Sequence, residues 1–186
     1  PRAEEQIEAP NAPAAELHVC PSGCAYSSVQ NAVDAAGDGD VIKVAAGTYT
    51  GVRSRAAPPG YDGPSVVAQV VYINKTVTLQ GGYPTAFTEP PNPDVNLTIV
   101  DAQRGGRVFY VTGGVTPTIE GLYITGGDAV GLAGGLGAGD SGGGICVVNA
   151  SAIISNNRIF GNTARWGGGL YLEESNAGGN GNTVTT

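Results

Sequence analysis

Short apolar runs alternate with turn residues along most of this chain. The runs are rich in valine, isoleucine and threonine, and glycine, asparagine or proline bounds most of them. Runs of this length and composition predict β-strands. The expected strands lie at 17–19, 40–45, 66–73, 76–79, 97–100, 108–111, 118–119 and 122–125. Two stretches rich in proline and glycine, 53–65 and 81–96, are expected to be long loops.

An internal repeat dominates the C-terminal part of the sequence. The segment Gly-Gly-Gly-Ile at 142–145 returns as Gly-Gly-Gly-Leu at 167–170, an offset of 25 residues. At the same offset, the segment 157–160 matches 182–185, and both begin with asparagine. Two matches at one offset indicate a repeating structural unit.

A second match extends the repeat upstream. Residues 119–124 resemble 154–159 at an offset of 35, and the extra ten residues match the glycine- and alanine-rich tract 131–140, a predicted loop insertion. Repeats of about 20–50 residues are typical of solenoids, in which each unit buries its apolar face against its neighbours. We therefore predict an all-β parallel solenoid of about five coils, roughly 24 Å long at the usual strand spacing.

One helix is predicted, at residues 27–36. Its apolar residues recur at the spacing of one helical face, namely Val29, Ala32, Val33 and Ala36. Ser27 with Gln30 is typical of a capping box, and Gly37 stands where a C-terminal cap belongs. Because the end of a repeat array exposes its core, we predict that this helix covers the first coil. A plain surface helix is the alternative.

The chain is expected to form one domain. Residues 1–16 are rich in proline, alanine and glutamate and predict a flexible lead-in to a domain at 17–186. Within the domain, 17–39 would form the N-terminal cap and 40–186 the coils. No cap is recognisable at the other end, which suggests a fragment of a longer protein.

Exposed sheet edges pair with other chains. The sequence thus predicts a symmetric homodimer formed through the C-terminal coils, with Leu170, Leu172 and Val184 at the contact. A head-to-tail stack is not expected, because the N-terminal helix would block it.

Charge and composition exclude several kinds of partner. The net charge is −7 and the nine basic residues form no cluster, which argues against nucleic acid and anionic membranes. No apolar run reaches the roughly 18–20 residues of a membrane span. The pair Cys20 and Cys24 predicts a small disulfide loop and therefore an oxidising compartment. A metal site including His18, or free thiols, are the alternatives, and Cys146 is expected to be a buried apolar residue.

These motifs resemble right-handed parallel β-helix proteins of the pectin-lyase-like superfamily. The resemblance lies in the helix at 26–36, the first strand at 40–49, the Gly-Gly-Gly-Ile turn at 142–145 and the asparagine-rich turn at 157–164. It covers residues 17–186 and is closest to bacterial secreted and surface proteins with adhesin-like repeats. It implies a secreted or cell-surface location.

The resemblance also suggests where chemistry would lie. Lyases of this superfamily use calcium held by carboxylates and an arginine base, and Asp101 with Arg104 or Arg107 is the most lyase-like group here. Solvated turn residues or surface ion pairs are the favoured explanation of these residues, so no catalytic residue is assigned. No metal or cofactor is required, although Asp128, Asp140 and Asn149 offer oxygen atoms that calcium favours.

The sequence favours a non-catalytic structural or adhesin-like protein that associates with itself. The alternative is a carbohydrate-active lyase or glycoside hydrolase fragment, for which a carbohydrate would be the partner.

Overall fold

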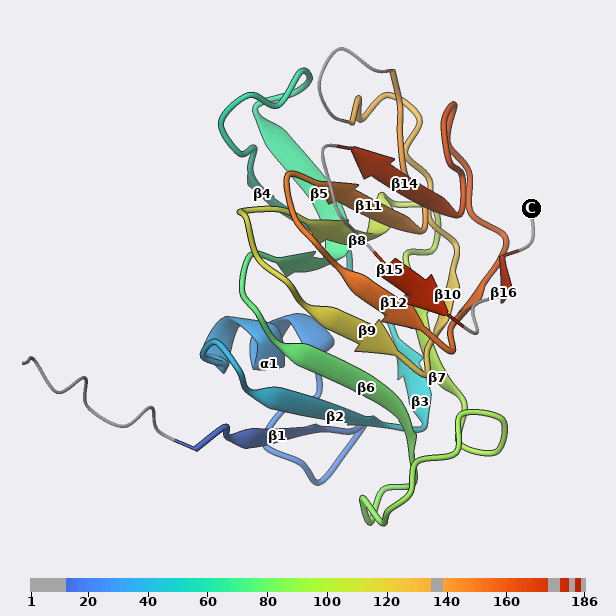
Figure 1. Cartoon of the computed structure of the whole chain (residues 1–186). Coiled ribbons are helices and arrows are strands. Elements are labelled where there is room, and N and C mark those ends of the chain that lie inside the picture. Colours follow the sequence, from blue (N-terminus) through green and yellow to red (C-terminus); the bar gives the residue numbers. More distant parts are fainter. Residues whose placement is uncertain (1–12, 135–138, 174–177, 181–182, 185–186) are drawn as a thin grey trace, which may run out of the picture.

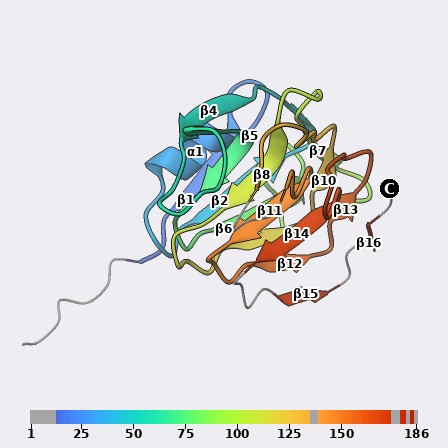
Figure 2. The same ribbon diagram turned by 90° about the horizontal axis from the view of Figure 1, so that it is seen from above.

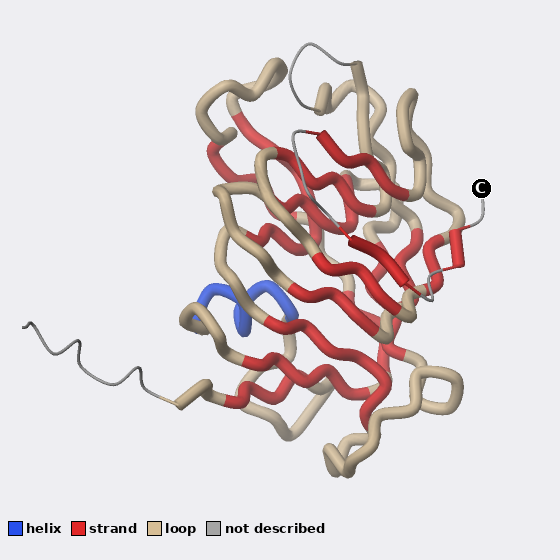
Figure 3. Tube along the Cα trace, viewed as in Figure 1, coloured by secondary structure: helices blue, strands red, loops and turns tan. Residues whose placement is uncertain are grey.

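Three β-sheets and one short helix make up the part of the chain that the computed structural model describes, which is residues 13–134, 139–173, 178–180 and 183–184. Residues 1–12 of the predicted lead-in lie outside it, and Glu16 already belongs to the first strand. Strands account for most of the regular structure (Figure 3).

Sheet A is parallel throughout. Figure 1 shows its strands stacked one above the next, with β1 at one end and β15 at the other. In spatial order they are β1 (Glu16–Val19), β2 (Val41–Ala45), β6 (Thr78–Tyr83), β9 (Thr118–Glu120), β12 (Ile153–Ser155) and β15 (Gly178–Asn180).

Sheet B is also parallel throughout. In spatial order its strands are β3 (Gly47–Tyr49), β7 (Thr98–Asp101), β10 (Tyr123–Thr125), β13 (Arg158–Ile159) and β16 (Thr183–Val184).

Sheet C is mixed, because β4 pairs with β5 in the antiparallel direction while its other pairs are parallel. Its strands are β4 (Arg53–Ala56), β5 (Val66–Ile73), β8 (Arg107–Val111), β11 (Ile145–Val148) and β14 (Leu170–Glu173).

The prediction of a single solenoid of about five coils is therefore wrong. The strands form three separate sheets, and the β4–β5 hairpin makes one of them mixed. The hairpin forms because the proline- and glycine-rich segment 57–65 turns the chain back on itself. The segment 53–65, expected to be a loop throughout, therefore begins as strand β4. The all-β class and the predominance of parallel pairing agree with the prediction.

The sequence repeat appears in the structure as strand register. The offset of 25 residues places Ile145 beside Leu170, and Arg158 beside Thr183. The offset of 35 places Ile119 beside Ile154. The described residues of the tract 131–140 fall in the connection between β10 and β11, where a loop insertion was expected.

One hydrophobic core joins the three sheets and the helix. In each sheet the inward side chains follow one another in register, and they are almost completely shielded from solvent. The rows are Ile42, Leu79, Ile119 and Ile154 in sheet A, Val100, Ile124 and Ile159 in sheet B, and Val71, Phe109 and Ile145 in sheet C. Burial of these side chains is the main stabilising contribution to the fold.

Helix α1 (Val29–Ala35) lies beside β4 and β5 (Figure 2). It matches the helix predicted at 27–36, apart from its ends. The predicted capping box is wrong, because the N-cap residue is Ser28 and its side chain makes no capping hydrogen bond. Gln30 is instead buried, where its Oε1 accepts a hydrogen bond from the Tyr72 N–H at 2.6 Å and its Nε2 donates to the Tyr72 carbonyl at 3.2 Å.

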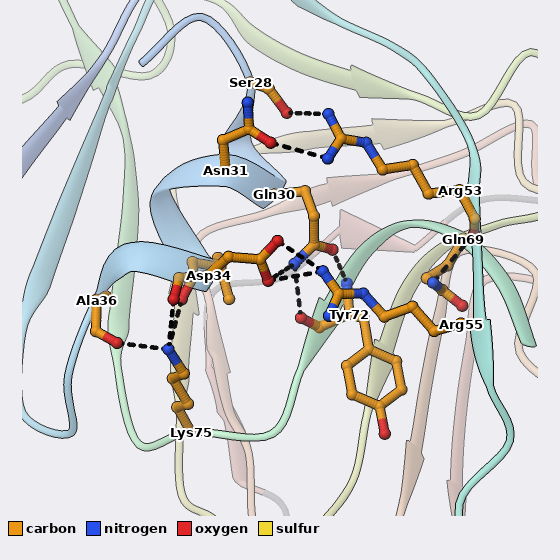
Figure 4. Close-up of polar contacts among 11 residues, drawn as sticks. Ser28, Gln30, Asn31, Asp34, Ala36, Arg53, Arg55, Gln69, Tyr72 and Lys75 are labelled. Carbon is orange, nitrogen blue, oxygen red and sulfur yellow. Dashed lines mark hydrogen bonds and ion pairs between the residues drawn. The ribbon is translucent and has the colours of Figure 1, made fainter. Parts of the chain in front are cut away.

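The end of the helix is held by a side chain from outside it. The ammonium group of Lys75 donates hydrogen bonds to the carbonyls of Val33, Asp34 and Ala36 (Figure 4). A cation suits the negative end of a helix and satisfies carbonyls that have no partner within it. Lys75 therefore satisfies the carbonyls at the end of the helix, the role that was predicted for a cap at Gly37.

Candidate functional site

The most distinctive surface of the molecule is formed by three edge strands. Within the described part of the chain, β14, β15 and β16 each stand last in their sheet and pair on one side only. They come from a single pass of the chain and are drawn in red in Figure 1. An edge strand offers N–H and C=O groups to another strand.

The free groups of β14 belong to Leu170 and Leu172. The N–H of Ile145 donates to the carbonyl of Gly169 at 2.9 Å, and the N–H of Asn149 donates to Glu173 at 3.1 Å. Since alternate residues of a strand turn their backbone groups to opposite sides, the groups of Leu170 and Leu172 point away from β11.

Val184 has the same orientation in β16. The N–H groups of Arg158 and Phe160 donate to carbonyls of Leu122 and Ile124, on the side of β10. The groups of Ile159 therefore face β16, and the register sets Ile159 beside Val184. The backbone groups of Val184 thus point to the open edge. The structure places all three residues predicted for self-association at sheet edges.

The inner face of β14 lacks the cover that earlier strands have. Ile73, Val111 and Val147 follow one another in register and are fully buried, but Leu172, next in that row, is 43% exposed. Leu170 packs against the core and is only partly buried. An apolar row that emerges into solvent at the edge of a sheet is a surface that gains from being covered.

The outer face of sheet C carries a second row that ends at the same strand. Tyr72, Tyr110, Cys146 and Tyr171 stand side by side in register. The rings of Tyr72 and Tyr110 stack with centroids 5.8 Å apart. Burial raises the pKa of the Cys146 thiol to about 12, which keeps it protonated and unreactive as expected for a buried apolar residue. Tyr171 ends the row and donates a hydrogen bond to Glu173 at 2.8 Å.

Arg107, a predicted lyase-like residue, is completely buried. Its Nε donates to the carbonyl of Ser141 at 2.8 Å, its Nη1 donates to the hydroxyl of Tyr61 at 3.2 Å, and its Nη2 donates to the carbonyl of Ala133. These contacts join Tyr61, Ala133 and Ser141 to the outer face of sheet C. The guanidinium is therefore a clamp between loops and is closed to a large substrate.

Of the other two lyase-like candidates, Asp101 ends strand β7 and Arg104 lies in the turn that follows it. Asp101 Oδ1 accepts a hydrogen bond from the Gln103 N–H at 2.8 Å, and Arg104 is exposed, with Nη1 3.3 Å from the Thr163 hydroxyl. Among the described residues, no ion pair joins Asp101 to either arginine.

The residues considered as calcium ligands also have roles in turns. Asp128 Oδ1 accepts from the Val130 N–H at 3.0 Å, and Asp140 Oδ1 accepts from the Ala133 N–H at 3.1 Å. Backbone N–H groups lower the pKa of Asp140, so it is ionised at neutral pH. Asn149 is exposed in a left-handed turn conformation. In the described ranges, no three His, Cys, Asp or Glu side chains gather closely enough to hold a metal ion.

A polar cluster near the N-terminus escaped the sequence analysis. The ammonium group of Lys43 lies 2.7 Å from carboxylate oxygens of both Glu16 and Glu89. His18 contacts Glu16 at 2.5 Å and stacks on the ring of Phe87, with centroids 3.9 Å apart. No local motif could reveal these contacts, because their partners come from distant segments.

A cleft of about 550 Å³ lies beside this cluster. Its walls include Glu16, His18, Tyr26, Thr85 and Phe87. The disulfide between Cys20 and Cys24, predicted from their spacing, is present, and Gly23 and Cys24 add to the wall. Two aromatic residues of the long loops pack against the sheets: Tyr61 meets the ring of Tyr110, and Phe87 lies near Tyr83, which is buried at the end of β6.

Comparisons of this chain with protein-family models, with curated proteins and with solved structures find no match. The resemblance to pectin-lyase-like proteins therefore remains an expectation from sequence. No helix in the described residues is long and apolar enough to cross a membrane.

Proposed function

We propose that this chain is a non-catalytic, secreted or cell-surface structural protein, adhesin-like in role, that self-associates as a homodimer through β14, β15 and β16. The observation that carries the proposal is the edge of β14. There Leu170 and Leu172 direct their backbone groups outward, and Leu172, the last residue of an otherwise buried apolar row, is itself 43% exposed. A second copy would satisfy the backbone groups and cover the leucines.

The disulfide supports the proposed location. The bond between Cys20 and Cys24 is of a kind that persists in oxidising compartments. The acidic net charge of −7 favours solubility and repels anionic surfaces. Both features suit a secreted protein or one displayed on a cell.

A carbohydrate-cleaving role has less support. Of the two arginines considered as the catalytic base, Arg107 is buried, and its guanidinium donates hydrogen bonds to three partners in loops. A carbohydrate that binds without being cut would find the cleft at His18 and Phe87, which has the size of many small-ligand sites. Incubation with polygalacturonate and calcium tests the enzymatic alternative, and cleavage would refute a non-catalytic role.

Light scattering over a hundredfold range of concentration tests self-association. We expect a dimer for the unaltered chain and a monomer for Leu172→Lys, because a charge on the edge opposes strand pairing. Val66→Lys is the matched control, since Val66 is also 43% exposed but lies on β5, which β8 and β11 separate from β14, and its variant should remain dimeric. A monomeric unaltered chain, or a dimeric Leu172→Lys variant, would overturn the proposal.

A further inference from the structure

The free backbone groups of β14 are arranged symmetrically about one residue. Leu170 and Leu172 direct their N–H and C=O groups to the open edge, and Tyr171 between them directs its own groups to β11. A strand whose free groups are evenly placed about a central residue is self-complementary when a second copy approaches in the antiparallel direction.

We infer that two copies join by antiparallel pairing of β14 with β14, with the twofold axis at Tyr171. The inference rests on the proposed self-association and specifies its geometry. In this register Leu170 lies opposite Leu172 of the second copy, and each pair exchanges N–H···O=C bonds in both directions. Every free backbone group of Leu170 and Leu172 then has a partner.

Other registers leave groups unsatisfied. Pairing centred on Leu170 would set Leu172 against Gly168 of the second copy, whose carbonyl already accepts the N–H of Gly144 at 2.8 Å. Pairing centred on Leu172 would set Leu170 against a residue beyond the end of β14. Since an unpaired buried backbone group is costly, the register centred on Tyr171 is favoured.

The side chains agree with this register. On the inner face, Leu170 and Leu172 of each copy would meet those of the other, which covers the exposed part of Leu172. On the outer face, Tyr171 would stand beside its own copy as a pair without mutual backbone bonds, with Cα atoms about 4.5 Å apart. The row that begins at Tyr72 would continue across the axis into the second copy.

The opposite edge of sheet C is unlike the edge formed by β14. That edge is β4, which runs antiparallel to β5. Arg53 and Arg55 of β4 also hold the helix, through Asn31 at 2.8 Å and Asp34 at 2.6 Å (Figure 4). Since twofold pairing of β14 with β14 uses the same edge of both copies, the assembly closes as a dimer at this edge.

The test is a disulfide across the axis. Tyr171→Cys is made together with Cys146→Ala, because Cys146 is the register neighbour of Tyr171 and would otherwise capture the new thiol within one chain. We expect mild oxidation to convert most of this variant into a covalent dimer that a reductant separates. Val130→Cys in the same background is the control, since Val130 is 63% exposed but lies in a loop, and it should stay uncrosslinked.

A second measurement keeps the test decisive if Tyr171→Cys disturbs folding, as circular dichroism would show. Leu170→Cys and Leu172→Cys, each with Cys146→Ala, are purified separately, carry tags of different mass and are then mixed. We expect the mixture to form the mixed covalent dimer, and each variant alone to form little. The geometry is wrong if light scattering shows a dimer but neither experiment crosslinks it. A monomer in light scattering would overturn both this geometry and the proposed function.

Discussion

The ammonium group of Lys43 lies 2.7 Å from a carboxylate oxygen of Glu89, so a charge on β2 holds the loop that follows β6. Glu16 of β1 contacts the same ammonium group at 2.7 Å. Lys43 is mostly shielded, and the two carboxylates raise its pKa. Three segments that are far apart in the sequence thus meet at one cation.

These contacts predict a loss of stability in acid. The pKa values of Glu16 and Glu89 lie below the ordinary value of 4.5, chiefly because Lys43 donates hydrogen bonds to both carboxylates. A carboxyl whose pKa is lowered in the folded state stabilises the protein above its unfolded-state pKa, and this stabilisation is lost as the pH falls through the folded-state pKa. We expect the Tm to be steady above about pH 5 and to fall below about pH 4.5.

Glu89→Gln isolates this effect. The variant should have a lower Tm than the unaltered chain at pH 7, and the difference should shrink between pH 7 and pH 3, as Glu89 takes up a proton on passing its folded-state pKa. Asp62→Asn, which alters an exposed loop carboxyl, is the control and should change the Tm little at either pH. An equal difference at both pH values would contradict the explanation.

Arg107 should contribute more to stability than any exposed arginine. In Arg107→Met, the Ser141 and Ala133 carbonyls lose their donors inside the protein, and each unsatisfied group costs about 1–3 kcal/mol. We expect urea denaturation to show a loss of about 2–4 kcal/mol. Arg107→Lys should not restore it, because a single ammonium group cannot reproduce the planar array of donors.

Arg104→Met provides the matched control for Arg107. Arg104 is three positions earlier and exposed, so its replacement should change the free energy of unfolding by less than about 0.5 kcal/mol. Similar losses for Arg104→Met and Arg107→Met would refute the role of the buried clamp.

Substitutions at two adjacent asparagines should differ in their effect on the free energy of unfolding. Asn157 is buried, where its Oδ1 accepts the Leu122 N–H at 3.0 Å and its Nδ2 donates to the Ile119 carbonyl at 2.8 Å. Asn157→Leu should cost about 2–4 kcal/mol, because both backbone groups lose their partner. Asn156 is exposed with φ of 53°, a conformation that glycine adopts without strain.

Asn156→Gly should therefore leave the free energy of unfolding within about 0.5 kcal/mol of the unaltered value. Thermal denaturation of the two variants side by side measures the contrast. A stable Asn157→Leu variant would show that its hydrogen bonds between strands are dispensable.

The positions of strands, and which strands lie side by side, were predictable where the local hydrophobic pattern and the sequence repeat agree. β-branched residues marked β5 and β8, and the repeat set β11 beside β14, because residues at equivalent positions meet in a parallel register. Asparagine recurs at the start of two repeat segments, and the first of these, Asn157, bonds to the backbone of a neighbouring pass. The edge positions of Leu170 and Leu172 followed from the same repeat.

Other features depend on contacts that no local pattern encodes. Strand β4 has the sequence Arg-Ser-Arg-Ala and is mostly exposed, so it lacks the alternation by which a strand is recognised. This strand makes sheet C mixed, where a regular solenoid would be parallel throughout. Arg107 carries a charge that normally marks the surface, and its partners Ala133 and Ser141 are 26 and 34 residues away.

The clamp at Arg107 also constrains the order in which the polypeptide can mature. Strand β8 leaves the ribosome well before residues 129–141, which supply two of the carbonyls that solvate its guanidinium. A nascent chain that has not yet reached Ser141 must keep Arg107 hydrated, so the outer face of sheet C cannot seal over Tyr110 until the later loop arrives. Completion of this face therefore has to wait until Ser141 has been synthesised, and we expect chains interrupted before Ser141 to be cleaved more readily by proteases.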